Sequence, residues 1–432
     1  MKKIFLNIII FAAAISLKAQ ETVYPAKAQT ETIALTNATI HIGNGQVIEN
    51  GTIVFSNGKI VEVGTAANTS GAKIIDCKGK QIYPGLIQPE SDLGLNEINS
   101  VNATSDEREL GENNANVRSI IAYNSDSKVI GTWRTNGILL ANIVPQGGII
   151  SGSSSVVQLD AWNWEDAAYK TDNGIHFRVP NLSAARGRGA FFAMNGNNAN
   201  PLQTALDRIE KARQFFKEAK AYYEEAVHEH TNIRFEAVKG LFNQSQIFFV
   251  HATTVKEIET GIEFAKEFGF KTVLVGGADC WKIASYLKEN NVAVILNEMH
   301  SLPVTQDDDV DQPYKTPYLL QQAGVLFAIS DTHEETKGRN LMFNAGVAAA
   351  YGLTKEEALQ AITLNAAKIL GIDDKTGSLE KGKDANIVVS EGDILDITTS
   401  KINYAFIQGR NVSLENKQTQ LYERYKYKYG IK

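Results

Sequence analysis

Residues 247–277, IFFVHATTVKEIETGIEFAKEFGFKTVLVGG, contain a strand, a helix and a second strand in succession. IFFVHA and KTVLVGG are short apolar runs of the kind found in buried strands. Between them, Thr254 and Glu257 have the spacing of a capping box, in which both side chains bind free backbone groups at a helix start. Gly269 is expected to end this helix. The stretch therefore predicts a parallel βα unit.

The same alternation continues on the carboxyl side of this unit. Apolar runs at 291–298 and 325–330 are separated by helical patterns, and a long amphipathic helix is predicted over 202–230. No glycine-rich phosphate-binding motif is present, so a (β/α)8 TIM barrel is favoured over a doubly wound sheet. Residues 146–180 do not show the alternation and are interpreted as an irregular hairpin insertion. The third and fourth barrel strands cannot be recognised.

Both flanks of the chain show a different, strand-and-turn pattern. Asn57-Gly58 lies between two alternating apolar runs, which is a strong signal for a β-hairpin. Because 384–396 and 402–412 have the same character, the two flanks predict one composite β domain. The resulting organisation is a signal peptide at 1–19, the composite β domain at 20–83 and 376–415, the barrel at 84–375 and a tail at 416–432. The tail is interpreted as a partly ordered, solvated end, with an extended arm that docks on a partner as the alternative.

Charge and the amino terminus limit the partners and the location. A net charge of −6 argues against nucleic acid or an anionic membrane as the main partner. Lys2 and Lys3 precede an apolar run and a cleavage site after Ala19, which is typical of a secretory signal peptide. An uncleaved anchor is the alternative. We expect an exported protein, in the bacterial periplasm, with no membrane span after cleavage.

Four motifs resemble the amidohydrolase superfamily and, within it, the imidazolonepropionase-like amidohydrolases. They are YPGLIQPESDLG (83–94), FFVHATTVKEI (248–258), LFAISDTHEE (326–335) and LTKEEALQAITLNAAKILGIDDKTGSLEKGKDANIVVSEGD (353–393). The resemblance implies a TIM barrel that hydrolyses C–N bonds other than ordinary peptide bonds, in amides or cyclic amides. It also implies metal ligands at the carboxyl ends of the barrel strands.

The site residues follow from the same resemblance. His251 matches the ligand after strand five and Asp331 matches the proton-accepting Asp of strand eight, so these two are the catalytic candidates. Glu90-x-Asp92 stands where the family has His-x-His, and Gln88 stands where an Asp is usual.

The sequence leaves two alternatives for a cofactor, a bound divalent metal or none. If a divalent metal is retained, its ligands are Glu90, Asp92, His251 and Asp331. The resemblance implies Zn²⁺, whereas so many carboxylates suit Mg²⁺ or Mn²⁺ better. Without a metal, the carboxylates would take up protons or pair with a base such as Arg339.

The remaining histidines divide into two groups. His300 and His333 are candidates for substrate binding, because they follow the seventh and eighth strands. His41 and His176 are interpreted as structural. His228 and His230 are assigned to the predicted helix over 202–230, on nearly opposite sides.

Two functions from different classes remain. The first is a hydrolase that acts on a small amide-type substrate. The alternative is a non-catalytic homologue that binds a ligand or serves as the partner subunit of an intact paralogue. A homo-oligomer and a hetero-complex with an intact amidohydrolase are both open.

Overall fold

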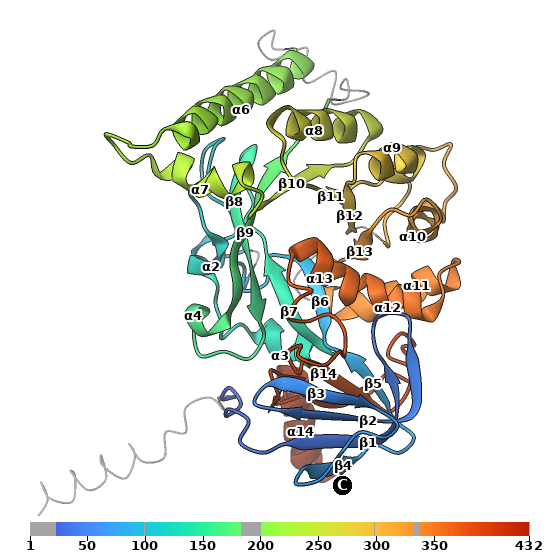
Figure 1. The fold of residues 1–432 in the computed structure, drawn as a ribbon. Helices are drawn as coiled ribbons and strands as arrows, with labels where there is room; N and C mark the ends of the chain where they lie inside the picture. The colour runs from blue at the N-terminus through green and yellow to red at the C-terminus, as the bar shows by residue number, and fades with distance from the viewer. Residues whose placement is uncertain (1–22, 99, 183–199, 298, 332–336, 432) are drawn as a thin grey trace, which may run out of the picture.

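The structure is a computed structural model that describes residues 23–98, 100–182, 200–297, 299–331 and 337–431. It contains two eight-stranded sheets, which occupy separate halves of the molecule in Figure 1. The predicted fold is confirmed, because one sheet forms a nearly closed barrel and the other forms a separate β domain. The predicted signal peptide at 1–19 lies outside the described residues.

The barrel strands follow one another around the sheet in chain order. They are β6 (Leu86–Ser91), β7 (Ile138–Ile143), β8 (Ile150–Gln158), β9 (Ala168–Arg178), β10 (Ile247–Ala252), β11 (Thr272–Gly276), β12 (Ala293–Leu296) and β13 (Phe327–Ile329). Side-chain hydrogen bonds join the first strand to the end of the last: Gln88 Nε2 donates to the Asp331 carbonyl at 2.7 Å and Ser330 Oγ to the Glu90 carbonyl at 3.0 Å.

The hairpin predicted over 146–180 is present, because β8 and β9 pair antiparallel, but the prediction that it is an insertion outside the barrel is wrong. These residues form β8 and β9, the third and fourth strands of the barrel. β8 runs antiparallel to both neighbours, whereas the other neighbouring pairs in the barrel are parallel. An antiparallel strand needs only a short connection, so no long helical crossover marks this part of the sequence. β8 is also rich in serine, and its buried hydroxyls bond to β9: Ser154 Oγ donates to Asn173 Oδ1 at 2.8 Å.

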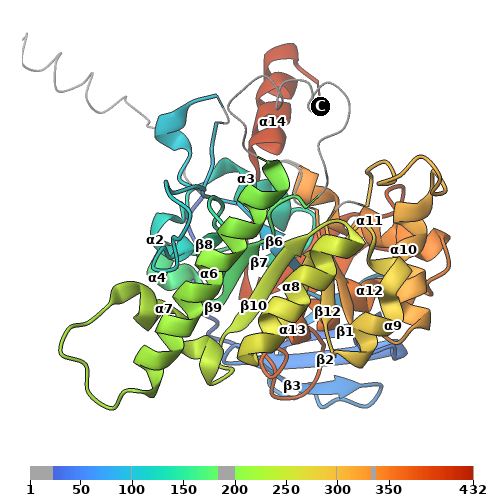
Figure 2. The ribbon, with the colours of Figure 1, turned by 90° about the horizontal axis from the view of Figure 1, so that it is seen from above.

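Helices pack on the outside of the barrel, as the view from above in Figure 2 shows for α6 and α8. They include α6 (Pro201–Glu224), α7 (Ile233–Phe242), α8 (Val255–Phe268), α9 (Ala284–Glu289), α10 (Gln312–Gln322), α11 (Leu341–Ala350), α12 (Lys355–Ala361) and α13 (Leu364–Leu370). The capping box of α8 is present, and Gly269 ends that helix with φ of 73°. The helix predicted over 202–230 instead ends at Glu224, so His228 and His230 lie in the loop before α7.

Shorter helices lie in the connections between these elements. They are η1 (Asn102–Thr104), α2 (Ser119–Ala122), α3 (Lys128–Arg134), α4 (Trp164–Ala167), η2 (Cys280–Ile283) and η3 (Lys337–Asn340). Among the described residues, no helix has the length and apolar character needed to cross a membrane.

The second sheet combines strands from both ends of the chain. Its members are β1 (Ile33–His41), β2 (Val47–Ser56), β3 (Lys59–Gly64), β4 (Lys73–Asp76), β5 (Gln81–Pro84), β14 (Ile387–Ser390), β15 (Ile402–Ile407) and β16 (Arg410–Asn411). β14 pairs antiparallel with β5, which joins the two flanks. The predicted hairpin turn is present, with φ of 51° at Asn57 and 76° at Gly58.

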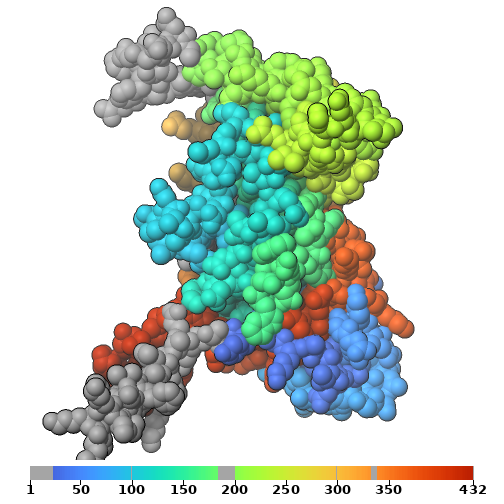
Figure 3. Space-filling model, turned by 90° about the vertical axis from the view of Figure 1, so that its left-hand side faces the viewer, coloured from blue at the N-terminus to red at the C-terminus, as the bar shows by residue number. Residues whose placement is uncertain are grey.

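The predicted exposure of the tail is confirmed, but its helix was not predicted. Residues Lys417–Tyr429 form helix α14, which contacts α3 and buries none of its own side chains. Figure 3 shows red carboxyl-terminal residues at the surface of the molecule, at the lower left.

Candidate active site

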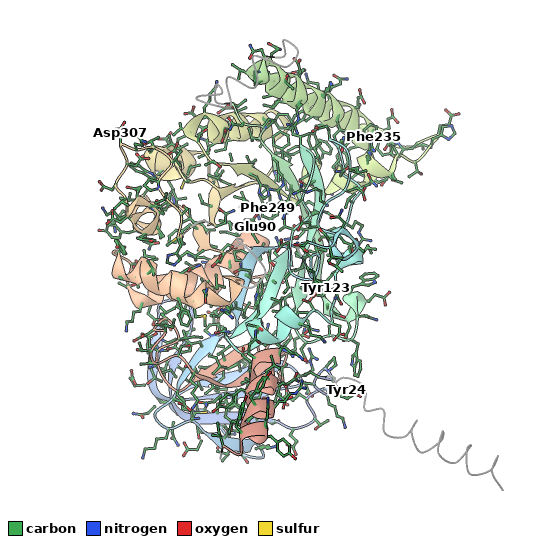
Figure 4. All side chains as sticks on the ribbon, turned by 180° about the vertical axis from the view of Figure 1, so that it is seen from behind. Tyr24, Glu90, Tyr123, Phe235, Phe249 and Asp307 are labelled. Carbon is green, nitrogen blue, oxygen red and sulfur yellow. The ribbon has the colours of Figure 1, made fainter. Side chains whose placement is uncertain are left out.

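The carboxylate of Glu90 lies at the end of β6, inside the barrel. Asn297, which follows β12, donates from Nδ2 to Glu90 Oε2 at 3.0 Å. Glu90 Oε1 is 3.5 Å from Nδ1 of His251, and these two side chains are 9% and 10% exposed. Figure 4 labels Glu90 beside Phe249 in the middle of the barrel. The site is therefore a nearly buried carboxylate and imidazole that solvent can still reach.

The strand register places a second histidine beside the first. In the parallel pair β9 and β10, His176 is paired with Phe249 and Arg178 with His251, so all four side chains share one face of the sheet. His176 Nδ1 lies 2.8 Å from His251 Nε2. The His176 ring stacks on Phe249 with a centroid distance of 4.6 Å. His176 was placed in an insertion and interpreted as structural; the structure places it in barrel strand β9, in contact with His251.

Arg178 brings a positive charge to the same point. Its Nη1 lies 3.3 Å from His251 Nδ1, its Nε donates to Ser151 Oγ at 3.0 Å and its Nη2 donates to the Pro145 carbonyl at 3.3 Å. Burial lowers the pKa of Arg178, and the charge of Glu90 opposes this shift. Because an arginine side chain does not lose its proton in proteins, the guanidinium remains charged.

Both imidazoles are neutral at ordinary pH. Burial, followed by the charge of Arg178, holds the pKa of His251 and of His176 well below the usual histidine value. Arginine N–H groups can only donate, so the contact with Arg178 makes Nδ1 of His251 the acceptor. Nε2 of His251 then carries the proton and donates to His176, which assigns the tautomers of both rings.

Asp92 and Asp331 do not join this group. Burial raises the pKa of Asp92 to about 6, and the charge of Glu107 adds to the rise. Asp331 Oδ2 accepts a hydrogen bond from Nδ2 of Asn344 in α11 at 3.1 Å, and its carbonyl accepts the bond from Gln88. Of the four predicted ligands, only Glu90 and His251 come together.

The two predicted substrate-binding histidines are not part of this cluster either. His300 is exposed on the connection between β12 and α10, where its ring contacts Tyr314 at 5.5 Å between centroids. His333 lies outside the described residues.

The described residues at the barrel mouth, which exclude 298 and 332–336, do not fit a divalent metal. Within the described part of the chain, no three His, Cys, Asp or Glu side chains are grouped so that they could hold an ion. A metal also needs a free lone pair on its imidazole ligand, and both nitrogens of His251 have protein partners. Arg178 adds a positive charge where a second cation would have to bind.

A cavity of about 660 Å³ lies away from this site. It is bounded by α3, α14 and the end of β8, and includes Arg134 and Asp160 among its lining residues. Asp160 is fully buried and accepts from Arg134 Nη1 at 2.7 Å and from Arg410 Nη1 at 2.9 Å. These ion pairs join the barrel to the second sheet, so we assign a structural role to the residues around this cavity.

Three site residues were missed by sequence reasoning: His176, Arg178 and Asn297. His176 and Arg178 occur two apart in NGIHFRVP, a pattern that places both on one face of a strand once that segment is recognised as a strand. Asn297 follows the apolar run of β12 directly, which was a usable signal.

Comparison with known proteins supplies the family. The family model described as "Amidohydrolase family" matches residues 186–414. This chain belongs to the amidohydrolase family. A solved amidohydrolase from Thermotoga maritima is similar at 25% identity, with a TM-score of 0.77 and coverage of 88% of this chain and 99% of that one. Family membership and fold support a hydrolase that acts on C–N bonds.

Curated relatives within the family are named imidazolonepropionase. The protein from Mesorhizobium japonicum is 26% identical over 74% of this chain and 80% of its own length. Those from Thermoplasma volcanium and Picrophilus torridus are 40% and 29% identical, but the match spans only 21% and 41% of their lengths. These similarities identify the chain as an imidazolonepropionase-like amidohydrolase.

Proposed function

We propose that this chain hydrolyses the C–N bond of a small amide or cyclic amide at the barrel mouth, without a bound metal. The observation that supports this is that the side chains of Glu90, Arg178 and His251 lie close together at the ends of β6, β9 and β10. Glu90 Oε1 and Arg178 Nη1 lie 3.5 and 3.3 Å from Nδ1 of His251. The carboxylate of Glu90 can accept a proton, and the neighbouring guanidinium of Arg178 stays positively charged because it is not deprotonated in proteins.

Glu90 is the general base of the proposed reaction. A water molecule forms a bond to the substrate carbonyl carbon and transfers a proton to Glu90, while the C=O electron pair moves onto the carbonyl oxygen. When the C=O bond forms again, the C–N bond breaks and Glu90 returns the proton to the leaving nitrogen. The products are a carboxylic acid and an amine, which remain one molecule if the amide was cyclic.

Asp331 and His251 have supporting positions in this proposal. Asp331 was expected to take the proton, but its carboxylate bonds to Asn344 and its carbonyl holds Gln88 at the seam of the barrel. His251 is neutral and holds Arg178 and His176 in place. We therefore assign the role of proton acceptor to Glu90 at the end of the first barrel strand, and not to Asp331 after the eighth.

The test is hydrolysis of a panel of acyclic amides and five-membered cyclic amides by chelator-treated protein. We expect turnover that survives chelation and falls by about 10²- to 10⁴-fold in Glu90→Gln. Glu112→Gln is the matched control, because the Glu112 side chain is 62% exposed and pairs with Arg208 of α6. Activity that requires added metal, or that is unchanged in Glu90→Gln, would contradict the proposal.

A second candidate is a non-catalytic subunit that binds a ligand or pairs with an intact relative. It is favoured by one observation, namely that both nitrogens of His251 are engaged by protein groups. Binding of panel amides without turnover, or turnover only in a complex with an intact amidohydrolase, would support this candidate over the first.

A further inference from the structure

We propose that the guanidinium of Arg178 takes the place of a catalytic metal: it excludes divalent ions from His251 and binds the carbonyl oxygen of the substrate. The second half of this statement rests on the proposed hydrolysis, whereas the first half is independent of any activity. Arg178 is assigned as a residue that binds substrate directly, and the ligand class is a neutral molecule with an amide carbonyl.

The position of Arg178 explains the exclusion. Nη1 approaches Nδ1 of His251 to 3.3 Å, on the side where Glu90 Oε1 also lies, 3.5 Å from the same nitrogen. A cation ligated by His251 and Glu90 would have to occupy this volume. The guanidinium already fills it, and a second positive charge at such a distance would be repelled.

The surroundings keep Arg178 in this position. The register that pairs Arg178 with His251 is continuous over the five pairs between β9 and β10. Ser151 and Pro145 accept from Nε and Nη2, so the plane of the guanidinium is held at three of its nitrogens. A group held this way requires little reorganisation when charge develops on a substrate.

The donor count identifies the ligand. Arginine has five N–H groups, and in the described structure three of them meet His251, Ser151 and Pro145. The other two, one on Nη1 and one on Nη2, have no partner among the described residues and are available to donate to the carbonyl oxygen of a substrate. As water attacks, that oxygen gains negative charge, and donors aimed at it are expected to contribute about 10²- to 10³-fold to the rate.

The experiment replaces the guanidinium by a metal ligand at the same place. Arg178→His puts an imidazole beside His251 and Glu90, and Arg178→Lys keeps a positive charge. The purified proteins are incubated with ZnCl₂, desalted and measured for zinc by mass spectrometry, with folding followed by circular dichroism. Arg208→His is the matched control, because Arg208 lies on the surface and pairs with Glu112.

We expect about one equivalent of zinc in Arg178→His, and far less in the wild type, in Arg178→Lys and in the control. Adding Glu90→Gln to Arg178→His should lower the bound zinc. If Arg178→His does not fold, Arg178→Cys supplies a thiolate at the same position. Zinc retained by the wild type and lost on His251→Ala would overturn the proposal, as would folded Arg178→His and Arg178→Cys proteins that stay free of metal.

The kinetic arm uses the wild type, Arg178→Lys and Arg178→Met on the same amide panel. We expect kcat to fall by about 10²- to 10³-fold in Arg178→Met, with a smaller change in KM and partial recovery in Arg178→Lys. An unchanged kcat in Arg178→Met would overturn the assignment to the carbonyl oxygen. If the wild type hydrolyses none of the amides, the proposed function is wrong. The zinc measurements still test whether Arg178 excludes divalent ions from His251.

Discussion

The substitution Asp92→Asn tests whether Asp92 is a partly buried carboxyl group whose charge is costly to desolvate, or a metal ligand. Burial and the charge of Glu107 raise its pKa from 3.8 to about 6. Above pH 6 the carboxylate is ionised in both the folded and the unfolded protein, so the folded state carries the full cost of burying the charge. A rise of this size corresponds to about 3 kcal/mol, at about 1.4 kcal/mol for each tenfold change in the ionisation constant.

The sign of the effect follows from the raised pKa. The cost is present above pH 6, decreases as the pH falls from 6 toward 3.8, and is absent below. Asparagine is neutral throughout, so Asp92→Asn should stabilise the protein by up to about 3 kcal/mol at pH 8 and by almost nothing near pH 4. Guanidinium chloride unfolding at both pH values measures the difference.

Asp126→Asn is the control, because that side chain is 85% exposed and should change stability by less than about 0.5 kcal/mol. Equal destabilisation by Asp92→Asn at both pH values would refute the reasoning. Loss of a bound metal in this variant would also refute it, because it would make Asp92 a ligand.

Three further predictions follow from other parts of the structure. His176 and His251 have low pKa values in the folded protein, so the unfolded state binds more protons below pH 6.5. The free energy of unfolding should therefore fall, as the pH is lowered below 6.5, by up to about 1.4 kcal/mol per pH unit for each histidine. Measured in the Asp92→Asn background, His176→Phe should halve this slope, whereas exposed His230→Asn should leave it unchanged. Phe216 of α6 is fully buried and contacts Phe248 and Phe264, so Phe216→Ala should cost about 3–5 kcal/mol in chemical denaturation, and loss of less than half of this would contradict the packing. Protein recovered from the periplasm of an expression host should begin at Gln20 by intact mass, and a cytoplasmic product that retains Met1 would contradict the proposed export.

The sequence predicted the fold well where local signals and tertiary packing agree. The capping box at Thr254 and Glu257 and the hairpin turn at Asn57 and Gly58 are both present. Such motifs depend on backbone geometry within a few residues. The same holds for the helix stop at Gly269.

The third and fourth strands could not be predicted because β8 buries several serine side chains and therefore lacks the apolar pattern of a buried strand. Its hydroxyls are bonded to β9, so burial here does not require an apolar pattern. Missing β9 also meant that His176 and Arg178 were not placed in the barrel. The candidate site was therefore predicted only in part: His251 and Glu90 were recognised, while the cation beside them was not.

Asp331 shows a different limit. Its place after the eighth strand was clear from the sequence, but the direction of its carboxylate depends on Asn344 of α11, thirteen residues away in the chain. Hydrogen bonds between side chains of separate elements have no periodic signal, so residue position predicts proximity to a site better than it predicts a role in it.

Titration of chelator-treated wild-type protein with Zn²⁺ and Mn²⁺ in a calorimeter tests the central claim most directly. Because Arg178 occupies the cation position at His251, we predict no binding stronger than about 8 kcal/mol, which corresponds to a Kd of about 1 μM. Stoichiometric binding of either ion with a Kd far below that value, abolished by His251→Ala, would show that the site is a metal centre and would contradict the account.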